Sequence, residues 1–157
     1  MRLVIQRVKW AAVQCSDLQM AEIGQGLLIL AGFGGQDDQD LPDSAAWNKI
    51  VLKIPDLRIF PDNQGRSNLS LHDIQGQILL VSQFTLFADC RKGRRPSFTR
   101  AADPEVAHSL YDRLYAQLQQ LVPHRVQQGI FGADMDLTFC NWGPVTIILD
   151  SADFQQT

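Results

Sequence analysis

The sequence predicts a single-domain α/β protein, a layered mixed β-sheet or partial barrel with two main helices on one face. Apolar segments of strand length alternate with two segments of helical periodicity, about seven strands in all. The 157 residues also match the usual size of one domain, and a hydrophobic content of 45% favours a folded chain over a disordered one. We expect residues 1–150 to form the domain and residues 151–157 to form a loose C-terminal tail.

Most of the expected strands lie in the first half of the chain. Residues 2–9 alternate between apolar and polar side chains, and residues 11–15 continue that strand. Residues 27–33 form an unbroken apolar run, which is typical of a strand covered on both faces. Residues 57–60 are expected to form a short strand, and residues 77–87 a second long and mostly apolar one.

Two helices are expected, each with a recognisable boundary. The first covers residues 42–54, because apolar side chains recur on one side of it and Pro55 ends it. The second starts near Asp103, which is a good N-cap residue, and Pro104 suits the first turn. Leucines at helical spacing carry this second helix to about Leu121.

The last two expected strands, residues 136–141 and 145–150, are separated by a Trp-Gly-Pro connection. Gly143 permits close approach of backbone, and Pro144 removes an N–H donor, so the pair can leave carbonyl oxygens free to face a ligand. The peptide bond before a proline is cis in only about 5–6% of cases. On the physics of the sequence alone, a hairpin turn is therefore the favoured interpretation.

Several classes of protein are disfavoured by the composition. The first ten residues lack a signal-peptide core, and the longest apolar run, residues 26–33, is too short to cross a membrane, so we expect a cytoplasmic protein without a membrane partner. The cysteines, at positions 15, 90 and 140, form neither a disulfide framework nor a zinc signature. The three histidines are scattered, and we expect no metal and no cofactor.

Positive charge is gathered at one place in an acidic chain. The formal net charge of −3 argues against a protein that wraps nucleic acid over a wide face, and DNA is not expected as a partner. The cationic side chains of the loop after residue 90 suit the phosphates of a small RNA segment, although a solvated loop remains the alternative. These side chains are Arg91, Lys92, Arg94 and Arg95.

The usual catalytic signatures are missing, since the chain contains no GxSxG, HExxH or P-loop motif. Cys140 beside Asn141 is a conceivable nucleophile, but a small buried strand residue is the favoured interpretation. Two unusual motifs remain. Residues 82–86, Ser-Gln-Phe-Thr-Leu, place hydroxyls and an amide at the end of an apolar strand, which suits a site for a small polar ligand and equally an edge strand with one polar face. The other motif is Asn-Trp-Gly-Pro-Val-Thr at residues 141–146.

With these two motifs the chain resembles the D-aminoacyl-tRNA deacylase family of the bacterial and eukaryotic type, also called D-tyrosyl-tRNA(Tyr) deacylase, whose signatures are SQFTL and NxGPVT. Trp142 is a departure, because the family often has Asp there, and Arg-Ser-Asn at residues 66–68 replaces a common Lys-Met-Asn. The similarity runs over almost the whole chain. Further blocks in family order are QRV at 6–8, GLL at 26–28, LRIF at 57–60, RPSF at 95–98 and FGADM at 131–135.

The resemblance implies chiral proofreading in translation. A homodimer would hydrolyse the ester between a D-amino acid, or glycine, and the 3′-terminal adenosine of tRNA, and would reject the L-amino acid. A cis Gly143–Pro144 motif of one subunit would reach the partner's site. Substrate would be bound by Ser82, Asn141, Gly143, Pro144, Met135 and Phe131. Catalysis would involve Gln83, Phe84 and Thr85, through main-chain groups and help from the substrate's own 2′-OH, and the basic loop would meet the acceptor end of the tRNA.

Two alternatives remain open on the sequence. One is a non-catalytic module that binds the acceptor end of tRNA. The other is an esterase of free esters or peptides in which Thr85 or Cys140 is the nucleophile. Release of the amino acid from tRNA distinguishes the first alternative from an enzyme, and thiol blocking tests the cysteine route.

Overall fold

One long strand, β1 (Arg2–Cys15), is the common neighbour of three others in the sheet. The computed structural model describes residues 1–15 and 18–154. Strand β1 pairs antiparallel with β2 (Leu18–Ile23) through its second half and with β3 (Gly26–Gly32) through its first half. Along its other edge β1 pairs antiparallel with β8 (Asp136–Asp150) over nearly its whole length. The predicted strands at residues 2–15 and 27–33 are confirmed.

The sheet is mixed, as predicted, because its remaining strands run parallel to β3. Strand β6 (Gln77–Ser82) pairs parallel with β3, and β7 (Val126–Gln128) pairs parallel with β6. A separate small hairpin consists of β4 (Phe60–Pro61) and β5 (Ser67–Leu69). The short strand predicted at residues 57–60 is wrong except for its last residue, since only Phe60 finds a strand partner.

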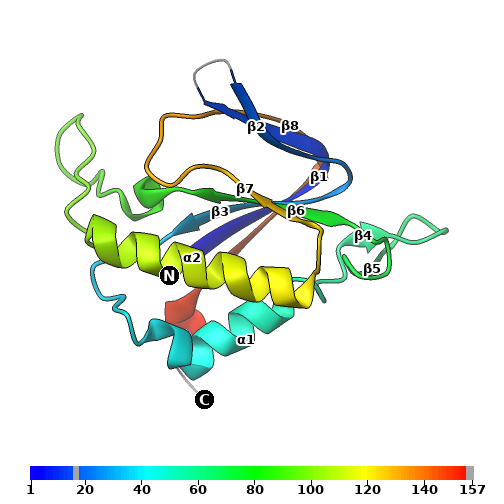
Figure 1. Cartoon of the computed structure of the whole chain (residues 1–157), viewed down its shortest axis with the longest axis horizontal. Coiled ribbons are helices and arrows are strands. Elements are labelled where there is room, and N and C mark those ends of the chain that lie inside the picture. Colours follow the sequence, from blue (N-terminus) through cyan, green and yellow to red (C-terminus); the bar gives the residue numbers. More distant parts are fainter. Residues whose placement is uncertain (16–17, 155–157) are drawn as a thin grey trace.

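Side chains alternate between two apolar cores on opposite faces of the sheet. Leu27 and Ile29 of β3 point to the first, the helix-side core, which α1 (Ala45–Lys53) and α2 (Pro104–Leu121) cover. Leu28, between them, points to the second, the barrel-side core, which β2 and the first half of β8 close from above (Figure 1). The period-two alternation explains why the whole run in β3 is apolar, and the partial barrel with two helices on one face is confirmed.

Both helices begin at a capping side chain, and only the second cap, Asp103, was predicted, since the first helix starts at Ala45 and not at residue 42. The Ser44 hydroxyl accepts a hydrogen bond from the Trp47 N–H at the start of α1, after a short 3-10 turn at Leu41–Asp43. The Asp103 carboxylate accepts one from the Glu105 N–H at the start of α2. Across the described residues, no helix has both the length and the apolar composition needed to span a membrane.

The end of the chain differs from the expected loose tail. Ser151–Phe154 forms a 3-10 helix that lies against α1, and Ser151 is buried. The backbone N–H of Ser151 donates to the carbonyl of Met1 at 2.9 Å, so the turn is joined to the start of β1. Residues 155–157 lie outside the described residues.

The strand predicted at residues 77–87 ends earlier than expected. Strand β6 stops at Ser82, and Phe84–Phe87 forms a 3-10 turn. The reason is the loss of partners, since β3 ends at Gly32 and β7 at Gln128. The last bond of the ladder runs from the Gln83 N–H to the Ala31 carbonyl at 2.7 Å. Beyond it the backbone satisfies itself locally, because the Ala88 N–H donates to the Thr85 carbonyl at 3.0 Å.

The hairpin predicted at residues 142–144 is wrong. Asp136–Asp150 is one strand of 15 residues that stays beside β1. Val8 pairs with Asn141 and Gln6 with Thr146, so Arg7 alone faces residues 142–145. The extra residues bulge out of the strand, and the chain continues in the same direction because β1 supplies partners on both sides of the bulge.

Candidate active site

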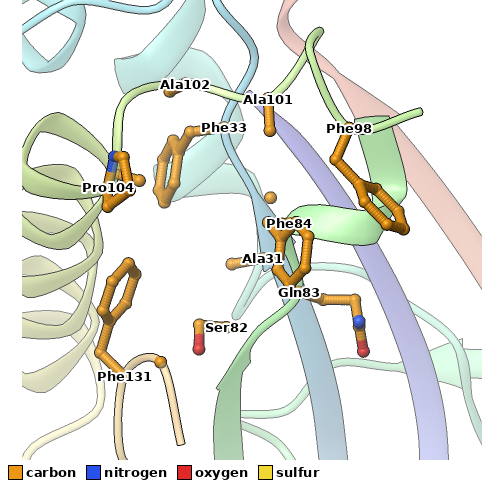
Figure 2. A pocket seen from close by; sticks show the side chains of 13 residues that line it. Ala31, Phe33, Ser82, Gln83, Phe84, Phe98, Ala101, Ala102, Pro104 and Phe131 are labelled. Atoms are coloured by element: carbon orange, nitrogen blue, oxygen red, sulfur yellow. The ribbon is translucent and has the colours of Figure 1, made fainter. Parts of the chain in front are cut away.

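A pocket of about 380 Å³ opens where β3 and β6 end. The carboxyl ends of parallel strands are a common place for ligand sites in mixed sheets. Figure 2 shows the rings of Phe33, Phe84 and Phe131 around the opening, with Ser82 between Phe131 and Phe84. The residues that line it come from β3, the start of the 3-10 turn, residues 98–104, α2 and the loop after β7: Ala31, Gly32, Phe33, Ser82, Gln83, Phe84, Phe98, Ala101, Ala102, Pro104, Ala107, Phe131 and Gly132.

The main chain at Gln83 lies unusually close to β3. A Cβ added to Gly32 would lie 2.7 Å from the Gln83 carbonyl oxygen, so only glycine permits this approach. The Gln83 N–H is already used by the Ala31 carbonyl. Within the described part of the chain, the next N–H, that of Phe84, has no hydrogen-bond partner. The first free main-chain donor after the sheet therefore stands at the pocket.

Thr85 lies outside the pocket and has no base beside it. Its side chain is exposed, and its hydroxyl accepts a hydrogen bond from the Gln83 side-chain amide at 2.6 Å. Among the described residues, no imidazole, amine or carboxylate is hydrogen-bonded to this hydroxyl. A nucleophilic threonine needs such a base, so the geometry gives Thr85 no means of activation.

The second motif is held by a single buried arginine. Arg7 is 7% exposed and is the residue of β1 that faces the bulge in β8. Its Nε donates to the Trp142 carbonyl at 2.9 Å, and its Nη1 donates to the Ile59 carbonyl. Desolvation by burial lowers the pKa of Arg7 from its ordinary value, but an arginine remains charged.

Gly143 sits against this arginine in a backbone conformation that other residues avoid. Its φ is +125°, and a Cβ added there would lie 2.5 Å from Nη2 of Arg7. The Gly143–Pro144 peptide bond is cis, as the resemblance implied and as the physics of the sequence did not favour. Both residues are exposed to solvent.

Asn141 closes the base of the bulge. Its Oδ1 accepts a hydrogen bond from the Val145 N–H at 3.3 Å, and its Nδ2 donates to the Thr146 hydroxyl at 3.2 Å. The side chain thus spans the bulge from one end to the other. Asn141 supports the loop that carries Gly143 and Pro144, and its amide is engaged within its own strand.

The structure brings together only some of the predicted site residues. Ser82, Gln83, Phe84 and Phe131 line the pocket, whereas Asn141, Gly143, Pro144 and Met135 do not. Met135 packs against the barrel-side core, and its sulfur would lie 2.8 Å from a Cβ added to Gly129. One copy of the chain therefore does not assemble the two motifs into one cavity.

The basic loop is less positive than its sequence indicates. The Arg91 guanidinium forms an ion pair with the Asp89 carboxylate, with Nη2 and Oδ2 2.5 Å apart. Hydrogen bonds from the side chain and backbone of Arg91 hold the pKa of Asp89 well below its usual range. Lys92, Arg94 and Arg95 are exposed and leave three cations for a ligand.

Sequence reasoning missed the role of Arg7 and the aromatic wall of the pocket. Arg7 was visible as part of an alternating strand, because it follows Leu3 and Ile5 on the buried side of β1. A charged residue at an inward position needs a partner, and that was an available signal. Phe33 and Phe98 gave no such signal, since apolar residues are expected in a strand and common in a loop. No group of His, Cys, Asp and Glu that could hold a metal ion occurs among the residues searched, those that the structure describes.

Comparison with known proteins identifies what this chain is similar to. Residues 4–150 match the family model described as D-Tyr-tRNA(Tyr) deacylase. A curated D-aminoacyl-tRNA deacylase of Nitratidesulfovibrio vulgaris (strain DP4) is 56% identical over 153 residues, which cover 98% of this chain and 94% of the relative. That of Solidesulfovibrio magneticus is 54% identical and covers 98% and 97%. A solved structure titled c-Myc DNA Unwinding Element Binding Protein has a TM-score of 0.84 and 38% identity, and covers 96% of this chain and 98% of that one.

Proposed function

We propose that this chain, which belongs to the D-Tyr-tRNA(Tyr) deacylase family, senses the handedness of its substrate with rigid backbone and hydrolyses it without a side-chain nucleophile. The chain is a hydrolase of D-aminoacyl-tRNA. The proposal concerns how the ester at the 3′-terminal adenosine is cut and how the L-amino acid is refused. The observation that carries it is the pocket at the end of β6, where aromatic walls adjoin the free N–H of Phe84.

The pocket suits the adenine base of the terminal adenosine. Its walls are mainly apolar and aromatic, and its polar groups are few, as in most sites for small organic ligands. The base can stack on an aromatic ring such as that of Phe131, because every base has a flat π-face. With the base in the pocket, the ester carbonyl would lie near Ser82 and the Phe84 N–H.

The free N–H of Phe84 would stabilise the oxyanion that forms when water attacks the ester. A fixed donor aimed at developing charge is an effective catalytic group, since it needs no reorganisation during the reaction. Among the residues that the structure describes, no base is hydrogen-bonded to Thr85, so the substrate's own ribose 2′-OH would orient or activate the water. The tetrahedral intermediate would then collapse by breaking the bond between the acyl carbon and the ribose oxygen, and the free amino acid would leave.

A second copy of the chain would complete the site. Leu3, Ile5 and Leu149 point to the helix-side core, so Val4 and its strand partner Ile148 face the opposite side. Ile148 is 63% exposed there, on the outermost strand. A long edge strand carries unpaired backbone groups, which favour pairing with a second chain. In the proposed homodimer, Gly143 and Pro144 of one subunit face Ser82–Thr85 of the other.

Chiral selection would follow from the carbonyl groups of Gly143 and Pro144. They would accept hydrogen bonds from the substrate ammonium and so fix the orientation of Cα. The side chain of a D-amino acid then points to open space, whereas that of an L-amino acid points into backbone that cannot move. Glycine has no side chain to refuse, so some cleavage of Gly-tRNA is expected. Discrimination rests on a clash with the wrong substrate as much as on contacts with the right one.

The test is a comparison of three substrates. D-Tyr-tRNA, L-Tyr-tRNA and Gly-tRNA are incubated with the purified chain, and release of each amino acid is followed. We expect release of D-tyrosine, slower release of glycine and little release of L-tyrosine, with no effect of chelator or thiol-blocking reagent. Binding without release would leave only a tRNA-binding module, and loss of activity on thiol blocking would favour the cysteine esterase. Equal rates for the two tyrosine esters would contradict the backbone mechanism.

A further inference from the structure

Trp142 adopts an unexpected position for a residue beside the Gly–Pro motif. Its indole ring does not line the pocket, and it packs partly buried against the helix-side core. The centre of the Arg7 guanidinium lies 4.7 Å from the centroid of this ring. The ring therefore lies outside the pocket and covers the arginine.

Arg7 and Trp142 contact each other twice, through a hydrogen bond and through a cation–π contact. The Trp142 carbonyl accepts a hydrogen bond from Nε of Arg7 at 2.9 Å, while the ring of the same residue covers the guanidinium. The attraction between a cation and an aromatic face is strongest where water is excluded, and Arg7 is 7% exposed. The ring thus limits the positions that the guanidinium can take.

This pair of residues is adjacent in sequence and in space to Gly143. The guanidinium lies directly beside this glycine, because a Cβ added to Gly143 would lie only 2.5 Å from Nη2. A movement of the guanidinium moves the Trp142 carbonyl, which belongs to the peptide that enters Gly143. Arg7 therefore contacts the bulge at two neighbouring points, the Trp142 carbonyl and Gly143.

We propose that Trp142 is a positioning residue for selectivity: by covering Arg7, its ring restrains the Gly143–Pro144 bulge and sets the ratio of D- to L-aminoacyl-tRNA hydrolysis. The inference rests on the proposed function of the bulge as the surface that refuses the L side chain. A looser bulge gives way to that side chain, so cleavage of L-aminoacyl-tRNA rises. The D substrate does not press on the bulge, and its cleavage changes much less.

Two variants of similar character separate the ring from simple packing. Trp142→Phe keeps an aromatic face over Arg7, and Trp142→Leu keeps apolar bulk without that face. We measure kcat/KM for D-Tyr-tRNA and L-Tyr-tRNA. Trp142→Leu is expected to lower the D-to-L ratio by about fivefold to thirtyfold, mainly through faster L cleavage, and Trp142→Phe to retain most of the ratio. Trp10→Leu is the control, since Trp10 is 40% exposed on β1 and has no contact with Arg7 among those described.

The outcomes are distinguishable from failure of the proposed function. If the unaltered chain cuts both esters equally, the backbone mechanism itself is wrong. If the unaltered chain is selective and Trp142→Leu, folded by circular dichroism, has the same ratio as Trp142→Phe, the role assigned to the ring is wrong. A fall in D and L rates by the same factor in Trp142→Leu would also overturn it, because a merely structural defect acts on both substrates alike.

Discussion

The pocket at the end of β6 and the bulge within β8 are built in opposite ways. The pocket exists because a strand loses its partners and leaves the sheet, which frees the N–H of Phe84. The bulge exists because a strand keeps its partner on both sides of an insertion, and Arg7 binds the carbonyl that the insertion turns inward. At the pocket, the N–H of Phe84 is free to bind a ligand. At the bulge, the donors of Arg7 are already bound to backbone carbonyls, which holds that backbone in place. The proposed mechanism needs both properties, a rigid backbone at the bulge and a free hydrogen-bond donor at the pocket.

Removal of Arg7 is expected to have the largest effect on the bulge. Arg7→Ala leaves the carbonyls of Trp142 and Ile59 without a donor, and we expect a loss of about 2–4 kcal/mol in the free energy of unfolding. Selectivity should fall as well, since the bulge loses its support. Urea unfolding and the D-to-L ratio measure the two effects. Arg66→Ala is the matched control, because Arg66 is exposed and holds its turn through main-chain groups that alanine keeps.

A methyl group at Gly143 tests the bulge alone. Gly143→Ala should cost about 1–3 kcal/mol in unfolding free energy, because φ is unfavourable for alanine and Nη2 of Arg7 occupies the space. Gly65→Ala separates the two causes, since Gly65 also has a positive φ, +75°, and nothing lies within 4 Å of the added Cβ. Thermal unfolding compares them. An equal cost at both positions would show that the contact with Arg7 adds nothing.

The basic loop contains one paired cation, Arg91, and other cations that are exposed, and the two kinds should contribute differently to tRNA binding. Neutralising Lys92 and Arg94 together should reduce the salt slope of tRNA binding by up to about two. Arg91→Gln should change the slope less, because its charge is already offset by Asp89. Binding titrations of tRNA at several salt concentrations give the slopes. The same slope change for Arg91 as for Lys92 would mean that the ion pair opens on binding.

The smallest effect is expected at Thr85, although it lies in the first motif. Thr85→Ala removes only a hydroxyl that accepts a bond from Gln83, so kcat/KM for D-Tyr-tRNA should remain within about fivefold. Single-turnover deacylation measures this directly. A loss of about a thousandfold or more with the fold intact is the signature of a missing nucleophile and would contradict the mechanism.

The sequence predicted those parts of the fold that local chemistry decides. The apolar run in β3 and the cap Asp103 are local signals, and α2 begins where that cap indicates, whereas α1 begins three residues later than predicted. The hairpin at residues 142–144 was wrong because turn chemistry says nothing about a distant strand, and β1 keeps both halves of β8 in line. The early end of β6 depended in the same way on where β3 stops.

The candidate site was predictable to the same limited extent. The two motifs were recognisable in the sequence, and the resemblance implied that they act across two subunits, but the register between β1 and β8 that places the second motif was not predictable. The ion pair between Asp89 and Arg91 also escaped notice, because residues two apart meet only when the loop folds back. Arg7 is a partial exception, because the alternation of β1 places it at a buried position. Its inward position in β1 follows from the sequence, although its two acceptors do not.

The central place of β1 makes the site part of the most protected region of the chain. The strand borders β2, β3 and β8, contributes Leu3 to one core and Val8 to the other, and carries Arg7 between them. The backbone at Arg7 can leave its place only when β1 separates from strands that both cores need. We therefore expect slow amide exchange in β1, and on the proposed mechanism the surface that excludes an L-amino acid would open only when these strands separate.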